Sequence, residues 1–326
     1  MAFGPLVSLP PYGFFQFPSF ALVRGRDAGP LYHEAPSIRA FDRSAVYLAV
    51  EEAFTSVASD LIPYGTLPAG IQNSPTLVIA HADSAQPAAV ANTQLSSLDR
   101  AKIATTFDST LGPDGTLELK VTYTGEGNTG AWMRGMKSLD QQQLGNQLQQ
   151  VASSLHHAAV LKNFTCTDFT DLNITPTVTL EMTIPGFAVK AGDLLLLNIP
   201  GVTYDAGDVG RPTREFDLFW SQVVSETTSG VIRLPDGLKP YAIPESVKFD
   251  SGPASYEAAL KATLKPNGQT IEFTDAYQLK VQTAPRDAYA DYKKCHEARA
   301  NLTRQRIILT TEPGSAQQAS AVRPAQ

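Results

Sequence analysis

The chain has 326 residues, of which 43% are hydrophobic and 18% charged, a composition that supports about two folded domains with an apolar core. The formal net charge of −6 and the lack of any basic run argue against a protein dedicated to nucleic acid. Two cysteines, Cys166 and Cys295, are too few for a disulfide framework or a zinc site, which leaves either a single bridge or two free buried thiols. No apolar run reaches the roughly 18 residues of a membrane span, so we expect no transmembrane segment.

The first 97 residues divide by composition into three stretches. Residues 1–40 are rich in proline and aromatic residues with little periodicity, which predicts an irregular lead-in, and Met1 to Phe20 lacks the basic start of a secretory signal. Residues 41–50 (FDRSAVYLAV) are apolar at consecutive positions, which predicts a strand buried on both faces. A Pro- and Gly-rich loop follows, with a short strand ending at Ile79. The Ala, Ser, Gln and Pro of residues 80–97 predict a linker.

The stretch from Leu111 to His157 reads as a hairpin followed by a helix. Asp114-Gly115 is a hairpin dipeptide, and the residues from Leu117 to Tyr123 alternate between apolar and polar, as in a strand with one wet face. Gly125, Gly127 and Gly130 then interrupt this alternating pattern. Ser138, with Gln141 three residues later, predicts a capped helix over 138–157. Its apolar stripe at helical spacing consists of Leu144, Leu148, Val151 and Leu155, which we expect to face the sheet.

The rest of the chain is dominated by short strand patterns separated by turn signals such as Pro235-Asp236-Gly237 and Pro266-Asn267-Gly268. The expected strands are 160–164, 177–184, 193–199, 215–220, 229–234, 256–264, 270–273 and 304–310. A second helix is expected from Pro285 to about Leu302, and residues 311–326 are expected to be disordered. The predicted fold class is therefore mainly β, with a β-sandwich-type domain over residues 98–310 and two packed helices.

Several residues have the right chemistry for a site, but each has a plainer interpretation that we favour. Cys166 is expected to be a small packed residue. Cys295 and His296 are adjacent in the predicted helix, where neighbouring side chains point about 100° apart, so they are poorly placed for proton transfer. His156-His157 follow a helix C-terminus, where contact with the helix dipole or solvent is the commoner role.

Three further groups are treated in the same way. The acidic loop residues Asp168, Asp171, Asp205 and Asp208 supply too few oxygen ligands at tight spacing for a calcium loop. The aromatic residues Trp132, Trp220 and Tyr204 would suit a carbohydrate platform, although aromatics on sheets are more often core. Gly125 to Gly130 lacks the Lys-Ser/Thr pair of a phosphate-binding loop. We therefore expect no cofactor and no metal ion.

The order of these features resembles the C-terminal half of bacterial transglutaminase-like proteins, in which a papain-like core lies between flanking β domains. The first similar stretch is FDRSAVYLAV with IPYGTLPAGIQNSPTLVI, and the second is the hairpin-to-helix segment with Gly125-Glu126 and Arg134. The third runs from SGVIRLPDGLKPYAIPESVKF through YQLKVQTAPRDAYADYKKCHEA to RIIL. The resemblance covers roughly residues 38–310. It implies that residues 41–79 are remnant strands of the transglutaminase-like α+β core.

The same resemblance implies which residues occupy the positions of the catalytic triad. The family His follows a Phe-Asp or Phe-Asn pair, and here Phe41-Asp42 is followed by Arg43. The family Asp ends the next strand, where this chain has Ser56. No Cys precedes Cys166, so the nucleophile is absent. Arginine cannot act as a base near pH 7, and serine brings no charge to stabilise an imidazolium, so no catalytic residue is assigned.

These observations favour a non-catalytic β-rich accessory or binding module of the cell envelope, with a protein or an envelope polymer as partner. One alternative is a fragment of a cysteine-dependent acyl-transfer or amide-hydrolysing enzyme that needs its upstream half, whether by natural truncation or a misplaced start. The other alternative is a carbohydrate-binding β-sandwich. The family resemblance implies an exported or periplasmic location. Residues 41–79, if apolar on both faces, are expected either to pack against the rest of the chain or to drive self-association.

Overall fold

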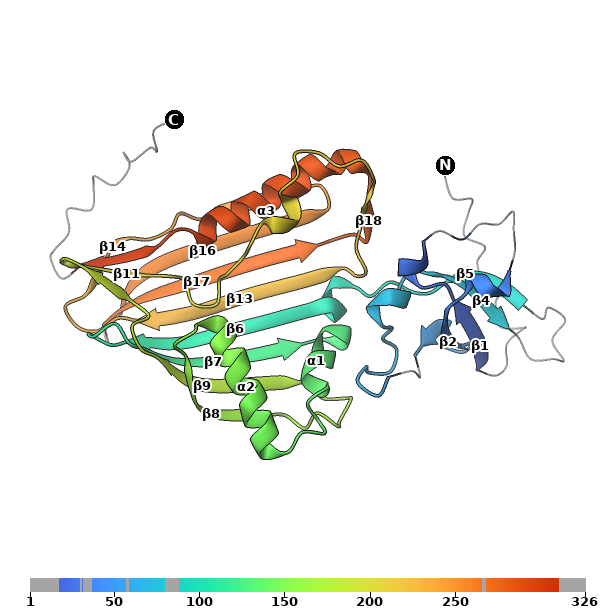
Figure 1. Ribbon diagram of the computed structural model, residues 1–326, viewed down its shortest axis with the longest axis horizontal. Helices are drawn as coiled ribbons and strands as arrows, with labels where there is room; N and C mark the ends of the chain where they lie inside the picture. The colour runs from blue at the N-terminus through green and yellow to red at the C-terminus, as the bar shows by residue number, and fades with distance from the viewer. Residues whose placement is uncertain are drawn as a thin grey trace.

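The structure is a computed structural model that describes residues 18–29, 31, 37–56, 59–79, 88–265 and 268–310. The predicted mainly β class is confirmed, because the described residues form several sheets and only three α-helices. The larger part of the fold is built on an eight-stranded sheet, and a smaller five-stranded sheet lies beside it near the start of β6 (Figure 1). The expected tail over 311–326 and the first 17 residues of the lead-in lie outside the described residues.

The eight-stranded sheet carries most of the hydrophobic core. From edge to edge its strands are β15 (Val247–Ser251), β16 (Ala254–Lys265), β17 (Gly268–Leu279), β13 (Val224–Arg233), β6 (Lys102–Leu111), β7 (Leu117–Gly125), β9 (Thr177–Ile184) and β8 (Val160–Cys166). All neighbours are antiparallel except β13 and β6. The order places β13 directly against β6, which is the first strand of this sheet along the sequence.

The alternation in β7 explains why the sheet has one dry and one wet face. Leu117, Leu119 and Val121 are buried, whereas Glu118 and Lys120 between them are exposed. The predicted hairpin before β7 is present, and Gly115 has a φ of 85°, a conformation that glycine adopts without a steric cost. The polar residues of β6, β7 and β9 share the wet face, where Thr122 and Thr179 lie 3.1 Å apart at their hydroxyl oxygens.

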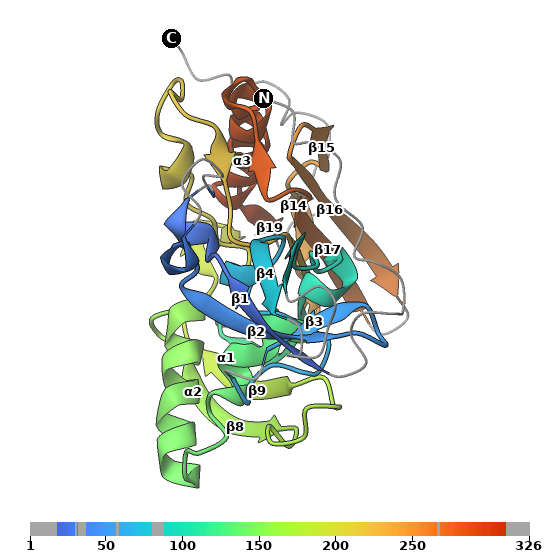
Figure 2. The ribbon, with the colours of Figure 1, turned by 90° about the vertical axis from the view of Figure 1, so that its right-hand side faces the viewer.

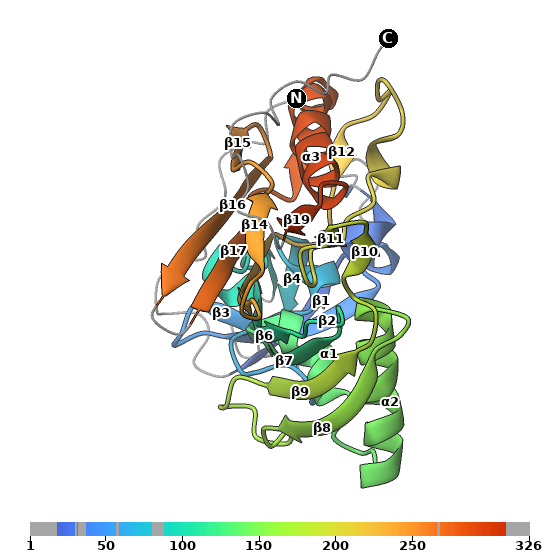
Figure 3. The same cartoon turned by 90° about the vertical axis from the view of Figure 1, so that its left-hand side faces the viewer.

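Helices and a second sheet cover the dry face. The helices α1 (Ala131–Arg134), α2 (Gln141–Leu155) and α3 (Tyr289–Thr303) all lie on this side (Figures 1–3). A four-stranded sheet has the order β10 (Val189–Ala191), β11 (Leu194–Leu197), β19 (Ile307–Thr310) and β14 (Lys239–Ala242), and a two-stranded sheet joins β12 (Leu218–Phe219) to β18 (Thr283–Ala284). The large sheet is thus covered on one face only.

The helix predicted over 138–157 is α2, and its start and its burial both differ from the prediction. Asp140, not Ser138, caps the helix, and it forms a capping box with Gln143. Leu148 is fully buried, whereas Leu144, Val151 and Leu155 are only half-buried. The partial burial follows from where α2 lies. The helix packs on β8 and β9 at the edge of the sheet, so the sheet does not cover the whole apolar stripe. The second predicted helix begins with a 3₁₀ turn, Arg286–Ala288, and continues as α3.

The small sheet has the order β3 (Ala53–Thr55), β2 (Arg43–Leu48), β1 (Ser19–Val23), β4 (Pro75–Ile79) and β5 (Ala88–Asn92) (Figure 2). It extends beyond residues 41–79, since β1 lies in the stretch predicted to be irregular and β5 in the predicted linker. Both strands are short, and their partners lie elsewhere in the chain. Their own local composition therefore gave little sign of pairing.

The prediction that residues 41–50 are buried on both faces is wrong. Ala45 and Tyr47 are buried against Leu67 and Ile71, but Val46 and Leu48 on the other face of β2 are only partly covered. The segment forms a small core of its own and meets the large part of the fold at a few points, among them Lys137 with Asp60 and Arg26 over the Phe219 ring. In the parts of the chain that the structure describes, no helix has the length and apolar character needed to cross a membrane.

Candidate functional site

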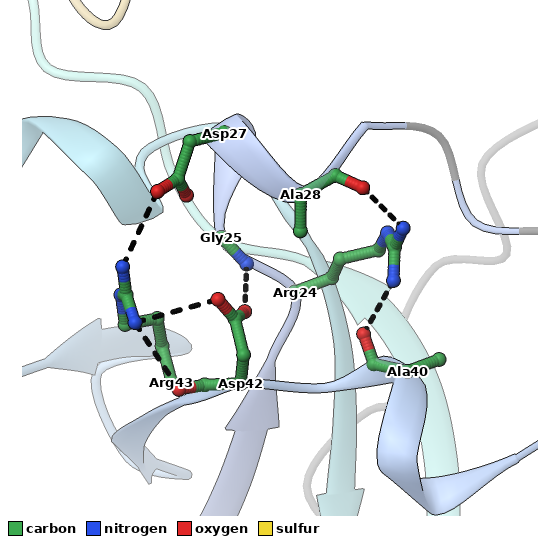
Figure 4. Close-up of polar contacts among 7 residues, drawn as sticks. All are labelled: Arg24, Gly25, Asp27, Ala28, Ala40, Asp42 and Arg43. Atoms are coloured by element: carbon green, nitrogen blue, oxygen red, sulfur yellow. Dashed lines mark hydrogen bonds and ion pairs between the residues drawn. The ribbon is translucent and has the colours of Figure 1, made fainter.

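Arg43, which the sequence resemblance aligns with a catalytic His, lies at the start of β2 in a surface cluster of charges (Figure 4). Its guanidinium is 3.4 Å from a carboxylate oxygen of Asp27 and 3.4 Å from one of Asp42, and half of its side chain is exposed. Asp42 accepts a hydrogen bond from the Gly25 backbone N–H at 2.7 Å. Arg24 nearby donates to backbone carbonyls, at 2.6 Å for Ala40. These contacts tie the loop after β1 to the start of β2.

Ser56, which the resemblance aligns with the orienting Asp, directly follows β3, the strand that neighbours β2. The two residues therefore lie on or next to adjacent strands. Neither side chain can act as a general base at pH 7, because one is a guanidinium and the other a hydroxyl. The chemistry of a papain-like triad is not available from these two residues.

Cys166 is the last residue of β8 and is half-buried. It packs against the main hydrophobic core, and burial raises the pKa of its thiol. Activated cysteines have a lowered pKa, because the thiolate is the nucleophile. Cys166 therefore has the environment of a packing residue, as predicted from its sequence context.

Cys295 and His296 lie in the middle of α3, but their side chains point to different neighbours. Cys295 is fully buried, and burial raises the pKa of its thiol to about 11. The His296 ring is held at both nitrogens by phenol groups: Tyr204 Oη contacts Nδ1, and Tyr277 Oη lies 3.1 Å from Nε2. Both ring nitrogens of His296 therefore have phenol partners.

The aromatic cluster around His296 continues into a charged group on the next helical turn. Arg299 lies over the rings of Tyr204 and Tyr277, 4.8 Å from each centroid, and donates to a carboxylate oxygen of Glu226 at 2.9 Å. Asp275 is buried on the neighbouring strand β17. This arrangement places a cation between two phenol rings and an acidic residue of the sheet.

Burial shifts the titration of the groups beneath α3 towards their neutral forms. The Tyr256 hydroxyl donates to an oxygen of Asp275 at 2.5 Å. Desolvation raises the pKa of the Asp275 carboxyl, an effect that the Tyr256 hydrogen bond and Arg299 partly oppose. Desolvation also raises the pKa of the Tyr256 and Tyr277 phenols. The cluster is therefore a satisfied polar core that docks α3 on the sheet.

Sequence reasoning missed this cluster, although α3 carried a signal for it. Tyr292, His296 and Arg299 recur at spacings of four and three, which places them on one helix face. That face looked too polar to be the buried one. The partners Tyr204, Glu226 and Tyr277 come from three distant segments, so only the folded chain brings them together.

The paired histidines at the end of α2 differ in exposure: His157 is exposed, as expected for a residue in contact with solvent, whereas His156 is partly buried. His156 and His157 stack with ring centroids 4.5 Å apart, and His156 also packs against Phe187 at 5.8 Å. The Nδ1 atom of His156 accepts a hydrogen bond from the Ala158 backbone N–H at 3.2 Å. Burial, with a contribution from the charge of His157, lowers the pKa of His156.

The acidic loop residues organise their own turns. Asp168 accepts hydrogen bonds from the Thr170 backbone N–H at 2.8 Å and its hydroxyl at 2.7 Å, and Asp171 accepts one from the Asn173 backbone N–H at 2.8 Å. Asp205 does the same for Gly207 at 3.2 Å. The side chain of Asp208 lies outside the described set. Within the described residues, no three His, Cys, Asp or Glu side chains are grouped as a metal site would need.

The structure does not assemble the three aromatic residues considered for a carbohydrate platform. Trp132 on α1 packs edge-on against Tyr123 with centroids 6.3 Å apart. Trp220 instead lies 5.0 Å from Tyr292, in the aromatic cluster that also holds Tyr204. Two of the three are therefore part of the docking surface of α3.

The glycines of 125–130 serve close packing of the backbone. A Cβ atom on Gly130 would lie 2.5 Å from the Gly125 carbonyl oxygen, so the two segments meet only because both lack side chains. Nearby, buried Arg134 donates to the carbonyls of Asp171 at 2.7 Å and Ile174 at 2.6 Å. Arg134 thus fixes the loop between β8 and β9.

The outer side of α3 borders a groove with a volume of about 370 Å³. One wall consists of Lys293, Glu297 and Asn301, which are spaced by four residues along the helix. The other wall consists of Ala206, Val209 and Gly210, at the ends of a 3₁₀ turn, and Arg304 lies at the end of the helix. Lys293 Nζ is 3.8 Å from Glu297 and 3.1 Å from the Arg211 carbonyl oxygen. The groove offers both signs of charge on a rigid helix.

Comparison with known proteins finds a family model that is similar to the C-terminal part of the chain. Residues 195–309 match the DUF3858 family, a domain of unknown function with a solved structure. This chain is similar to a crystal structure described as a "putative protease" from Parabacteroides distasonis ATCC 8503. The two share 9% sequence identity, and their superposition has a TM-score of 0.46. The alignment covers 90% of this chain and 40% of that protein, so this chain spans about two fifths of its length. No curated protein matches. The family match contains α3, the cluster around His296 and the groove.

Proposed function

We propose that the chain is a non-catalytic β-rich accessory or binding module related to transglutaminase-like proteins of the bacterial cell envelope. The observation that carries the proposal is the state of its two thiols. Burial raises the pKa of both Cys166 and Cys295, and the ring of His296 is held by two phenol groups. Arg43 and Ser56 stand where the resemblance places a base and its orienting carboxylate.

The groove beside α3 is the surface that we assign to binding. Its volume is within the range of about 300–1,000 Å³ that is typical of ligand sites. Lys293, Glu297 and Arg304 supply charges of both signs, which suits a polar or zwitterionic group of a peptide or an envelope polymer. The helix that carries them is fixed from below by the polar cluster.

The test combines thiol labelling with an activity assay on the full chain. A fluorescent maleimide at pH 7.5 should label Cys166 slowly and Cys295 only after denaturation. Incubation with a glutamine-bearing protein and a fluorescent primary amine should give neither amine incorporation nor peptide release. Turnover that disappears in Cys166→Ala or Cys295→Ala would overturn the proposal and support the cysteine-dependent enzyme instead.

A further inference from the structure

The edges of the sheets differ in how they are protected against pairing with another chain. An open edge exposes unpaired N–H and C=O groups, and proteins usually block it with charges, proline, bulges or short strands. In the large sheet, β8 carries Lys162 and an irregular register after Leu161, and β15 carries Lys248 and Asp250. Both edges of this sheet therefore carry a recognised obstacle to pairing.

The remaining edges, apart from β5, are protected in similar ways. In the four-stranded sheet, β14 contains Lys239 and Pro240 with an irregular register, and β10 is three residues long and includes Lys190. The edge strand β3 of the small sheet also has three residues. Its Phe54 N–H donates to the Gln94 side-chain oxygen at 3.0 Å, so a side chain occupies the place of a further strand.

Among the described edges of three or more residues, β5 is the exception. Its five residues, AAVAN, contain no charge and no proline, and its pairing with β4 is regular from Ala88 to Asn92. Val90 at its centre is 53% exposed. Among the strands that the structure describes in the three larger sheets, β5 is therefore the edge whose sequence and register carry no such obstacle.

We propose that β5 pairs antiparallel with β5 of a second copy of this chain, around a two-fold axis at Val90. A two-fold axis perpendicular to the sheet reverses the direction of the second β5 strand and keeps the same face outward, so the two strands run antiparallel and the contact is isologous. Val90 then faces its own counterpart, and Ala88 faces Asn92. Because β5 carries no charge, no like charges meet across the axis. The two five-stranded sheets become one sheet of ten strands.

The outer face of the small sheet supports a second copy over a foreign peptide. Val90 lies opposite Leu77, and Leu77 lies opposite Leu22, so their side chains form an apolar row on the half-covered face. Pairing of two β5 strands joins this row to the same row of the second copy. It therefore places a larger continuous apolar surface across the axis, which an unrelated extended peptide would not supply. This inference gives the self-association predicted for residues 41–79 a specific location just outside that range.

Sedimentation equilibrium of the full chain tests the proposal with a matched pair of variants. The native chain should show a concentration-dependent mass that approaches twice the monomer mass. Val90→Lys puts a charge on the axis and should weaken the dimer at least tenfold. Val160→Lys is the control, since Val160 is 55% exposed on the already protected edge β8 and should leave the association unchanged. A native chain that stays monomeric overturns the proposal, as does equal weakening by both variants.

Cross-linking provides a second measurement, which tests whether β5 is the place where two chains meet. In antiparallel pairs, facing Cα atoms lie about 4.5–5.5 Å apart, within the range a disulfide can bridge. In a Cys166→Ser background, Val90→Cys should form a disulfide-linked dimer under mild oxidation much faster than Val160→Cys. Equal rates for the two variants would exclude β5 as the contact.

Discussion

Arg299 is the residue whose removal most directly tests the polar cluster beneath α3. Its side chain is 15% exposed, it donates to Glu226, and it lies over two phenol rings. Arg299→Met keeps much of the packing of the stem and removes the charge. Each cation–π contact is worth about 1 kcal/mol when partly desolvated, and the ion pair, discounted because Glu226 is 37% exposed, about 1 kcal/mol more. The expected loss of unfolding free energy is therefore roughly 2–4 kcal/mol.

The matched control is Arg233→Met. Arg233 also pairs with an acidic residue, Asp108, but on the wet face of the sheet, where the two side chains are 51% and 55% exposed. Exposed pairs of this kind contribute about 0–1 kcal/mol. Urea denaturation followed by circular dichroism measures both variants. If Arg299→Met costs no more than Arg233→Met, the cluster is not held together by the arginine, and the reasoning is wrong.

Two further changes have effects that follow from burial. Leu148→Ala should cost about 2–5 kcal/mol in urea denaturation because Leu148 is fully buried, whereas Leu264→Ala, at a side chain 76% exposed, should cost less than about 0.5 kcal/mol. A small loss for Leu148→Ala would mean that α2 serves a partner. Cys295 has a pKa raised from 9.0 to about 11, so its contribution to stability is complete below pH 9 and is lost as the pH rises to 11, by roughly 3 kcal/mol. The stability difference between the native chain and Cys295→Ala should shrink over that interval, and a constant difference would contradict the buried thiol.

The sequence predicted well those elements whose cause is local. The alternation in β7 and β9 determines which side chains enter the core, and Gly115 supplies the positive φ that the hairpin needs. The start of α2 was harder, because Ser138 and Asp140 are each followed by a glutamine three residues later. Two overlapping capping boxes satisfy the same local rule, and the structure uses the one that starts at Asp140.

The parts that could not be predicted depend on pairing between distant segments. Strand β13 enters the sheet parallel to β6, although more than a hundred residues separate them, and nothing in either strand specifies that neighbour. Similarly, Tyr204 and Glu226 belong to one cluster with Arg299 only because β13 and α3 meet in the fold. Local periodicity contains no information about such contacts.

The composition of α3 explains how a polar helix face can be the buried one. A buried hydroxyl or guanidinium costs free energy only when it lacks a partner, and here the groups beneath α3 pair with one another. Directional contacts fix the rotation of the helix about its axis more strictly than an apolar stripe would, since a slip by one residue breaks several hydrogen bonds at once. The same rotation determines that Lys293, Glu297 and Asn301 face the groove. The buried side of α3 carries the polar cluster and its outer side borders the groove. The contacts of the cluster therefore orient the charged side chains that α3 presents to the groove.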